Sequence, residues 1–165
     1  MTRTRTITWD DPNEVNANLQ RFSGLEFLTR VANGDLPPPP MARLMNIRIS
    51  EVAKGRVVFE GTPEEYHYNP LGVVHGGMAA TLLDSALGCC VNSHLDAGDF
   101  YTTLELKINY LRPITIDTGQ VRAIATTVHI GRTTAVVEGR IVDAHDRVYA
   151  YASSTCLIRR SGSAS

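Results

Sequence analysis

The residues from Gly76 to about His94 constrain the fold of this chain more than any other segment. Apolar side chains dominate the run, which predicts one long helix. They point to every side of that helix, at Met78, Ala79, Ala80, Leu82, Leu83, Ala86, Leu87, Cys89, Cys90 and Val91. A helix that is apolar nearly all round is buried nearly all round. One sheet covers only one side of such a helix, so a second chain is the simplest candidate for the other side.

Strand patterns flank this helix on both sides. After it, leucine, isoleucine and tyrosine alternate with polar residues over 104–110, the period-two pattern of a strand. The connections among the later strands are short, which favours antiparallel pairing. The expected strands cover residues 44–52 and 56–62, then 104–110, 120–129, 133–142 and 147–158, with a loop over 63–74. Two strands, one helix and four strands predict an α+β fold.

The N-terminal residues read as a helical arm. Asp11 and Pro12 suit a helix start, and Gly34 suits its end. Between them runs an apolar stripe of Phe22, Leu25, Leu28 and Val31. The four prolines of 37–40 are expected to be an extended spacer rather than an element.

Three segments follow from this pattern. Residues 1–40 are the helical arm and proline-rich spacer, 41–160 are the main domain, and 161–165 are a flexible Gly/Ser tail. We interpret the arm as an element that packs on the domain, with a lid over a substrate as the alternative. The first residues, through Trp9, lack the apolar core of a signal peptide and are interpreted as a frayed end.

Composition argues against several classes of protein. The chain carries 16 basic and 17 acidic residues, a net charge of −1, whereas nucleic-acid binding needs a basic surface. No stretch reaches the ~20 apolar residues that a membrane helix requires. The three cysteines are an odd number without metal spacing, and the five histidines show none either. We therefore expect no disulfide framework, no metal and a cytoplasmic protein.

Asp84 does not fit the apolar helix. It is the only charged residue between Gly76 and Leu95. Burying an unpaired carboxylate is costly, so an aspartate there has a partner or a chemical task. The alternative is an aspartate that faces water on a less buried stripe of the helix.

The start of the same helix offers hydrogen-bond donors. His75, Gly76 and Gly77 lead directly into it, and glycines allow close approach to the backbone. Free N–H groups at a helix start carry partial positive charge and can hold an oxyanion. A carboxylate that activates water, together with such donors, is sufficient for acyl transfer to water.

The spacing of these groups requires two chains. Gly76 and Asp84 are eight residues apart, which is about 12 Å along a helix at ~1.5 Å per residue. One carbonyl cannot contact the Gly76 N–H while water held by Asp84 of the same chain attacks it. Antiparallel pairing of two such helices would place Gly76 of one chain near Asp84 of the other.

This stretch resembles the PaaI-type branch of the hotdog-fold acyl-CoA thioesterases. The motif is Asn69-x-x-Gly72-x-x-His75-Gly76-Gly77, with Asp84 seven residues later. The resemblance extends from about residue 25 to 157 and includes Leu111-Arg112-Pro113 and Gly131-Arg132. It implies a hotdog fold, in which an antiparallel sheet wraps around the long helix, and active sites at dimer interfaces.

The resemblance also assigns roles by position. It implies that Asp84 is the general base or a nucleophile, and that the Gly76 amide of the partner chain polarises the thioester carbonyl. Asn69 would hold the thioester or the water, and Thr103 would position the water. His75 would shape the loop or hydrogen-bond near the thioester.

The implied substrate is an acyl-CoA, with no separate cofactor because CoA is part of the substrate. Gly77, Arg112 and Arg132 are candidate CoA contacts, since arginine pairs well with phosphate; ordinary surface arginines are the alternative. A homodimer is required and a homotetramer is expected, with no nucleic-acid or membrane partner. Cys89, Cys90 and Cys156 are interpreted as core residues rather than nucleophiles.

Two other functions stay open at this point. One is an acyl-thioester hydratase or dehydratase on the same fold, although these use a histidine with a carboxylate in a different motif. The other is a non-catalytic acyl-CoA-binding protein, because fold does not fix function. The acyl group itself does not follow from the spacing, and aromatic, medium-chain and long-chain groups are all compatible with it.

Overall fold

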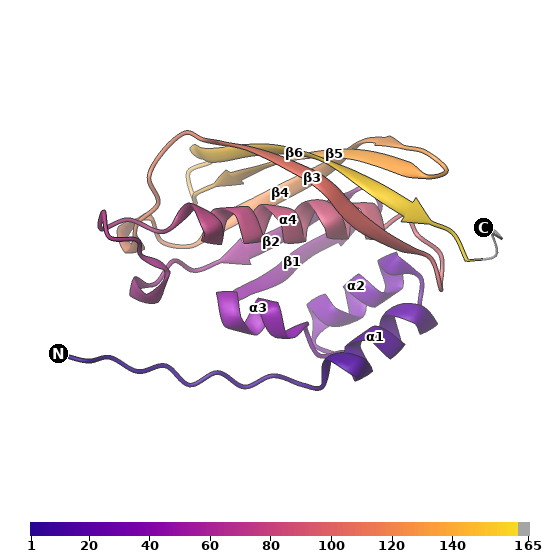
Figure 1. The fold of residues 1–165 in the computed structure, drawn as a ribbon, viewed down its shortest axis with the longest axis horizontal. Helices are drawn as coiled ribbons and strands as arrows, with labels where there is room; N and C mark the ends of the chain where they lie inside the picture. Colours follow the sequence, from indigo (N-terminus) through magenta and orange to yellow (C-terminus); the bar gives the residue numbers. More distant parts are fainter. Residues whose placement is uncertain (162–165) are drawn as a thin grey trace.

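The computed structural model describes residues 1–161 and contains one six-stranded antiparallel sheet (Figure 1). The strand order is β1-β2-β4-β5-β6-β3, so β1 and β3 form the two edges. The bounds are β1 Ile47–Ala53, β2 Arg56–Gly61, β3 Phe100–Tyr110, β4 Val121–Ile130, β5 Thr134–Val142 and β6 Val148–Arg159. Two 3-10 turns, η1 Glu65–His67 and η2 Ile116–Thr118, lie in the connections. The predicted α+β class and antiparallel pairing are confirmed.

The long helix α4, Gly76–Asn92, lies in the curve of this sheet and packs against β2, β3, β4, β5 and β6. Leu82, Leu83, Ala86 and Leu87 turn toward the strands and are fully buried. This is the hotdog arrangement that the sequence predicted. One stripe of α4 stays open in the single chain: Gly77 and Asp84 are exposed, and Ala80 and Thr81 between them are half-buried.

The arm contains two helices where the sequence predicted a continuous one. α1 spans Pro12–Arg21 and α2 spans Gly24–Asn33. The break occurs because Phe22 is extended and Ser23 caps α2, its hydroxyl accepting a hydrogen bond from the Glu26 N–H. The predicted end at Gly34 is confirmed, with φ of 83° in the left-handed region.

The proline run also ends differently from the expectation. Pro40 begins a short helix, α3 Pro40–Met45, because proline suits the first helical position. The strand predicted from residue 44 therefore starts only at Ile47, after Asn46 has turned the chain with φ of 54°. Figure 1 shows α1, α2 and α3 gathered beside β1.

The first ten residues are extended, and the structure attaches them at Arg5 rather than leaving a frayed end. The Arg5 guanidinium donates to the backbone carbonyls of Leu44 and Arg43 at 2.9 and 3.0 Å, and it lies 4.0 Å from the centre of the Tyr66 ring. At the other terminus, the Ser161 N–H donates to Asp99. The rest of the predicted flexible tail, 162–165, lies outside the described residues.

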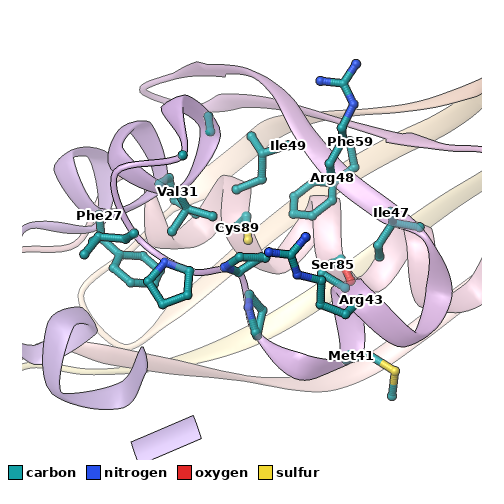
Figure 2. Close-up of a pocket in the computed structure, with 18 of the residues that line it drawn as sticks. Phe27, Val31, Met41, Arg43, Ile47, Arg48, Ile49, Phe59, Ser85 and Cys89 are labelled. Atoms are coloured by element: carbon teal, nitrogen blue, oxygen red, sulfur yellow. The ribbon is translucent and has the colours of Figure 1, made fainter. Parts of the chain in front are cut away.

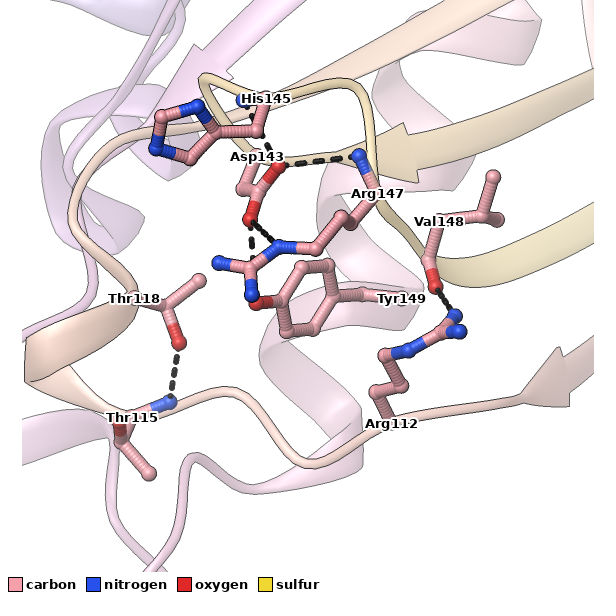
Figure 3. Close-up of polar contacts among 8 residues, drawn as sticks. All are labelled: Arg112, Thr115, Thr118, Asp143, His145, Arg147, Val148 and Tyr149. Carbon is pink, nitrogen blue, oxygen red and sulfur yellow. Dashed lines mark hydrogen bonds and ion pairs between the residues drawn. The ribbon is translucent and has the colours of Figure 1, made fainter.

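A buried aspartate holds the turn between β5 and β6 (Figure 3). The Asp143 carboxylate is 1% exposed and accepts hydrogen bonds from the backbone N–H groups of His145 and Arg147, the Arg147 side chain and the Tyr149 hydroxyl. Burial alone would raise the pKa of Asp143, but these donors outweigh it and lower the pKa to about 2. The ionised form is therefore the one that the fold stabilises.

We expect Asp143→Asn to lower the thermal unfolding midpoint by several degrees at pH 7. Because the folded pKa lies below the unfolded value of 3.8, the stabilisation by Asp143 is complete above pH ~4 and is lost as pH falls toward ~2. The difference from wild type should therefore shrink over that interval. Asp146→Asn in the same turn is the control, since asparagine tolerates its φ of 60° and its side-chain oxygen can still accept the hydrogen bond from Arg122 at this exposed position. A pH-independent difference for Asp143→Asn would contradict the linkage.

Candidate functional site

Asp84 lies on the open stripe of α4, and its carboxylate is the centre of the candidate site. The neighbouring Leu82 and Leu83 are fully buried, whereas the helical turn places Asp84 on the exposed stripe, beside the edge strand β3. Thr103 on β3 donates its hydroxyl to Asp84 Oδ1 at 3.0 Å. In the single chain the Asp84 carboxylate therefore faces solvent, as the alternative interpretation held. Its hydrogen bond with Thr103 also gives it the partner that the functional interpretation required.

The N-terminus of α4 forms a second group of residues. His75 is the N-cap, and its Nδ1 accepts the Gly77 N–H at 2.8 Å. This leaves Gly76 as the donor of the first turn for which the described residues provide no acceptor. The sequence suggested donors at both glycines, whereas the capping histidine occupies one of them.

Tyr110, at the end of β3, closes one side of Gly76. Its hydroxyl donates to the Gly76 carbonyl at 3.2 Å, and a Cβ at Gly76 would lie 3.2 Å from the ring. Sequence analysis did not single out this tyrosine, because it simply continues the strand alternation. Only the sheet register shows that β3 ends beside the start of α4.

Asn69 shapes the loop that leads to α4. Its Oδ1 accepts the N–H groups of Leu71 and Val73 at 2.9 and 3.4 Å, which forms a side-chain-to-backbone turn. Gly72 completes that turn with φ of 79°. The Asn69 side-chain oxygen is therefore engaged by the loop in the single chain.

The predicted residues fall into two groups that one chain does not bring together. Asp84 and Thr103 lie at the middle of α4, whereas Asn69, His75, Gly76 and Gly77 lie at its start. Eight residues of the same helix separate the two groups, about 12 Å at ~1.5 Å per residue. The distance between Gly76 and Asp84 is therefore the one expected from the sequence, and it is the reason why a second chain was required.

The two arginines are also far apart. Arg112 follows β3 near the start of β6 and donates to the Val148 carbonyl. Arg132 lies in the β4–β5 turn, next to Thr133, whose carbonyl accepts from Ile158 near the end of β6. About ten residues of one strand separate these ends, roughly 33 Å at ~3.3 Å per residue. One chain does not join them into a single phosphate site.

A cavity of about 730 Å³ opens beside Asp84 (Figure 2). Asp84, Ser85 and Cys89 of α4 and Tyr101 and Thr103 of β3 line one end. Residues of α2, the proline segment, α3, β1 and β2 line the rest. The sequence shows the apolar stripe of the arm, but it does not show where the arm docks.

Cys89 lines this cavity without being suited to attack a substrate. Burial raises the pKa of its thiol to about 12, so the thiolate is scarcely populated near neutral pH. Cys90 and Cys156 are buried in the core. Cys90 and Cys156 agree with the interpretation of these cysteines as core residues, whereas Cys89 is partly buried and lines the cavity.

Residues 1–161 were predicted to hold neither a metal nor a membrane helix. They contain no group of three or more histidine, cysteine or acidic side chains that could hold a metal ion. No helix in the same range is long and apolar enough to span a membrane.

Comparison with known proteins supplies the family context. The Thioesterase superfamily pattern matches residues 71–150. The 1,4-dihydroxy-2-naphthoyl-CoA hydrolase of Listeria monocytogenes serotype 1/2a (strain 10403S) is 27% identical over 116 residues, which cover 70% of this chain and 93% of the relative. ComA2 of Bacillus subtilis (strain 168) is 30% identical over 119 residues, covering 69% of this chain and 90% of the relative.

Solved structures extend the likeness to the fold. A phenylacetic acid degradation-related protein from Ralstonia eutropha JMP134 superposes with a TM-score of 0.72 and 28% identity. The match covers 79% of this chain and 98% of the other. The helix α4 and the strands β3, β4 and β5 lie inside residues 71–150, which match the superfamily pattern.

Proposed function

Because the chain belongs to the hotdog-fold thioesterase superfamily, we propose that it hydrolyses an acyl-CoA to a free acid and CoA, at a site shared by two copies of the chain. The observation that carries this proposal is the Asp84 carboxylate, which stands on an otherwise apolar helix, is held by Thr103 and faces a cavity. The CoA-thioester named in the Listeria relative supports acyl-CoA as the substrate class.

The proposed reaction adds water across the thioester bond. Asp84 takes a proton from water as the water oxygen bonds to the carbonyl carbon. The carbonyl oxygen becomes negative and accepts a hydrogen bond from the Gly76 N–H of the partner chain. The C–S bond then breaks, and the sulfur leaves with the electron pair and takes up the proton. A thiolate, whose conjugate acid has a pKa of ~8.5, leaves without a strong acid beside it.

Asp84 as a nucleophile is a variant of the same proposal. Its oxygen would then bond to the acyl carbon, and water would later open the anhydride at the Asp84 carboxyl carbon. A single turnover in H₂¹⁸O separates the two routes. General-base catalysis places the heavy oxygen in the released acid, whereas the anhydride route places it in Asp84.

The free edge of β3 supports the two-chain arrangement. This strand pairs with β6 on one side only, and its 11 residues expose Phe100, Leu104 and Tyr110 at 51, 57 and 57%. A long apolar edge strand is a surface that proteins normally cover. Antiparallel pairing of two β3 edges would cover it and would bring two α4 helices side by side. A tetramer of such dimers stays a prediction.

Thr103 would act as a positioning residue for Asp84. We expect Thr103→Val to lower kcat roughly 10-fold, the effect of one hydrogen bond worth ~1.4 kcal/mol, with little change in KM. Thr103→Ser keeps the hydroxyl and should restore most of the rate. Steady-state kinetics on one acyl-CoA test this, and equal losses in both variants would show that shape rather than the hydrogen bond matters.

The experiment that tests the function is release of free CoA thiol from a panel of acyl-CoAs by the purified wild-type chain. Size-exclusion chromatography with light scattering establishes its oligomeric state in the same buffer. Hydrolysis by a dimer or larger assembly supports the proposal. A folded dimer that binds acyl-CoA without releasing thiol would favour the binding protein, and hydration of an unsaturated acyl-CoA would favour the hydratase. Full activity in a monomer would refute the shared site.

A further inference from the structure

The arm forms a wall of the cavity beside Asp84. The lining includes Phe27 and Val31 of α2, the prolines 37–39, and Ile49 and Phe59 of β1 and β2. Figure 2 labels Phe27, Val31, Ile49 and Phe59 around the cavity. All of these residues lie outside 71–150, the part of the chain that matches the superfamily pattern. Gly76, Asp84 and Thr103 lie within that match, whereas the arm residues that line the cavity precede it.

The arm is docked tightly and at a defined place. Gly24, the first residue of α2, donates its N–H to the Leu95 carbonyl at 2.9 Å. A Cβ at Gly24 would lie 1.8 Å from the Asn92 carbonyl oxygen, so only glycine permits this approach. Phe27 and Leu28 are buried one turn later. This contact fixes α2, which carries Phe27 and Val31, against the end of α4.

The chemistry of the lining selects the apolar end of an acyl-CoA. Arg43 and Arg48 are the basic residues that line the cavity, but Asp10, Asp35 and Asp84 line it as well. Arg48 is in addition paired with Glu60. A pocket with more carboxylates than guanidiniums does not favour the phosphates of CoA, whereas its aromatic, aliphatic and proline walls favour hydrocarbon. The volume of about 730 Å³ far exceeds what an acetyl group would fill.

We infer that the arm is the wall of the acyl-binding pocket and that it selects apolar acyl chains of medium length or longer. This inference rests on the proposed function. With the thioester carbonyl at Asp84, the acyl chain extends from Thr103 past Cys89 toward Val31. The sequence favoured an arm that packs on the domain. According to this inference, the arm determines which acyl groups are hydrolysed.

The test is a chain-length profile of kcat/KM from acetyl-CoA to dodecanoyl-CoA, with phenylacetyl-CoA added. For wild type, kcat/KM should rise about threefold to fourfold with each added methylene until the cavity is full, because each CH₂ is then buried. Val31→Trp fills the cavity and should lower kcat/KM for decanoyl-CoA by at least ~10-fold, while acetyl- and butyryl-CoA stay within about twofold.

Thr29→Trp is the matched control, because Thr29 is exposed on the same helix. It should keep the wild-type profile. If Val31→Trp does not fold, Ala32→Phe fills the cavity from the adjacent lining position. An unchanged profile in the folded variant, or a preference of wild type for phenylacetyl- over decanoyl-CoA, would overturn the inference.

Failure of the proposed function gives a different result. In that case wild type releases thiol from none of the acyl-CoAs, and the pocket is tested by titrating decanoic acid into wild type and Val31→Trp by calorimetry. Binding that wild type shows and Val31→Trp loses supports the pocket without catalysis. No binding to wild type, or equal binding to both proteins, overturns it.

Discussion

Asp84→Asn is expected to lower kcat for acyl-CoA hydrolysis by at least ~100-fold, the order of effect of losing a general base. Asparagine has nearly the same size and still offers an oxygen to the Thr103 hydroxyl, so the contact at 3.0 Å can persist. What is lost is the negative charge that takes the proton from water. KM should change little, because the substitution does not alter the walls of the cavity.

Asp96→Asn is the matched control, since Asp96 is an exposed aspartate in the loop after α4. It should retain wild-type kinetics. Both variants should also elute as wild type does on size-exclusion chromatography, which shows that assembly is intact. A rate for Asp84→Asn within a few-fold of wild type would mean that the family assignment holds while another group activates the water.

The sequence was sufficient to predict the features that local pattern determines. The apolar circumference of α4 predicted burial, which the single chain provides everywhere except along the stripe of Gly77 and Asp84. The alternation in β3 predicted a strand. Asp84 was identifiable because a single charge in an apolar helix contradicts its surroundings. The expected separation of Gly76 and Asp84 followed from helix geometry alone. Each of these inferences uses neighbours within a few turns of chain.

Features that depend on distant contacts did not follow from the sequence. The break at Ser23 is a local cap, but an uninterrupted apolar stripe across Phe22 and Leu25 concealed it. The arm docks where Gly24 meets Asn92, a contact between residues 68 positions apart. The occupation of the Gly77 N–H by His75 required side-chain geometry. The Gly24–Asn92 contact is tertiary, and local propensity carries no information about it. The caps by Ser23 and His75 are local contacts that depend on side-chain geometry.

Gly76→Pro is expected to lower kcat by about 100-fold to 1000-fold, the loss measured when one oxyanion donor is removed. Proline has no N–H, and it is well suited to the first position of a helix. The preceding His75 is extended with ψ of 136°, which is the conformation that a following proline requires. The substitution therefore removes the donor without breaking α4.

Gly76→Ala is the control that isolates the N–H. Both side chains place a Cβ about 3.2 Å from the Tyr110 ring, so the two variants share the steric effect. Alanine keeps the N–H and should retain far more activity than proline. Equal losses in the two variants would assign the effect to crowding at Tyr110 and would remove Gly76 from the reaction.

Mixing the two defective chains then tests whether the site is shared. A dimer that pairs an Asp84→Asn chain with a Gly76→Pro chain has two sites. If each site is built across the interface, one site carries both substitutions and the other carries neither. Coexpression with two different tags isolates this heterodimer, which should recover about half of the wild-type activity by twofold symmetry. If each site instead used Asp84 and Gly76 of one chain, both sites of the heterodimer would carry a defect and no activity would return. Recovery therefore cannot arise from a site within one chain, which makes the mixed dimer the decisive measurement on how the two groups of residues meet.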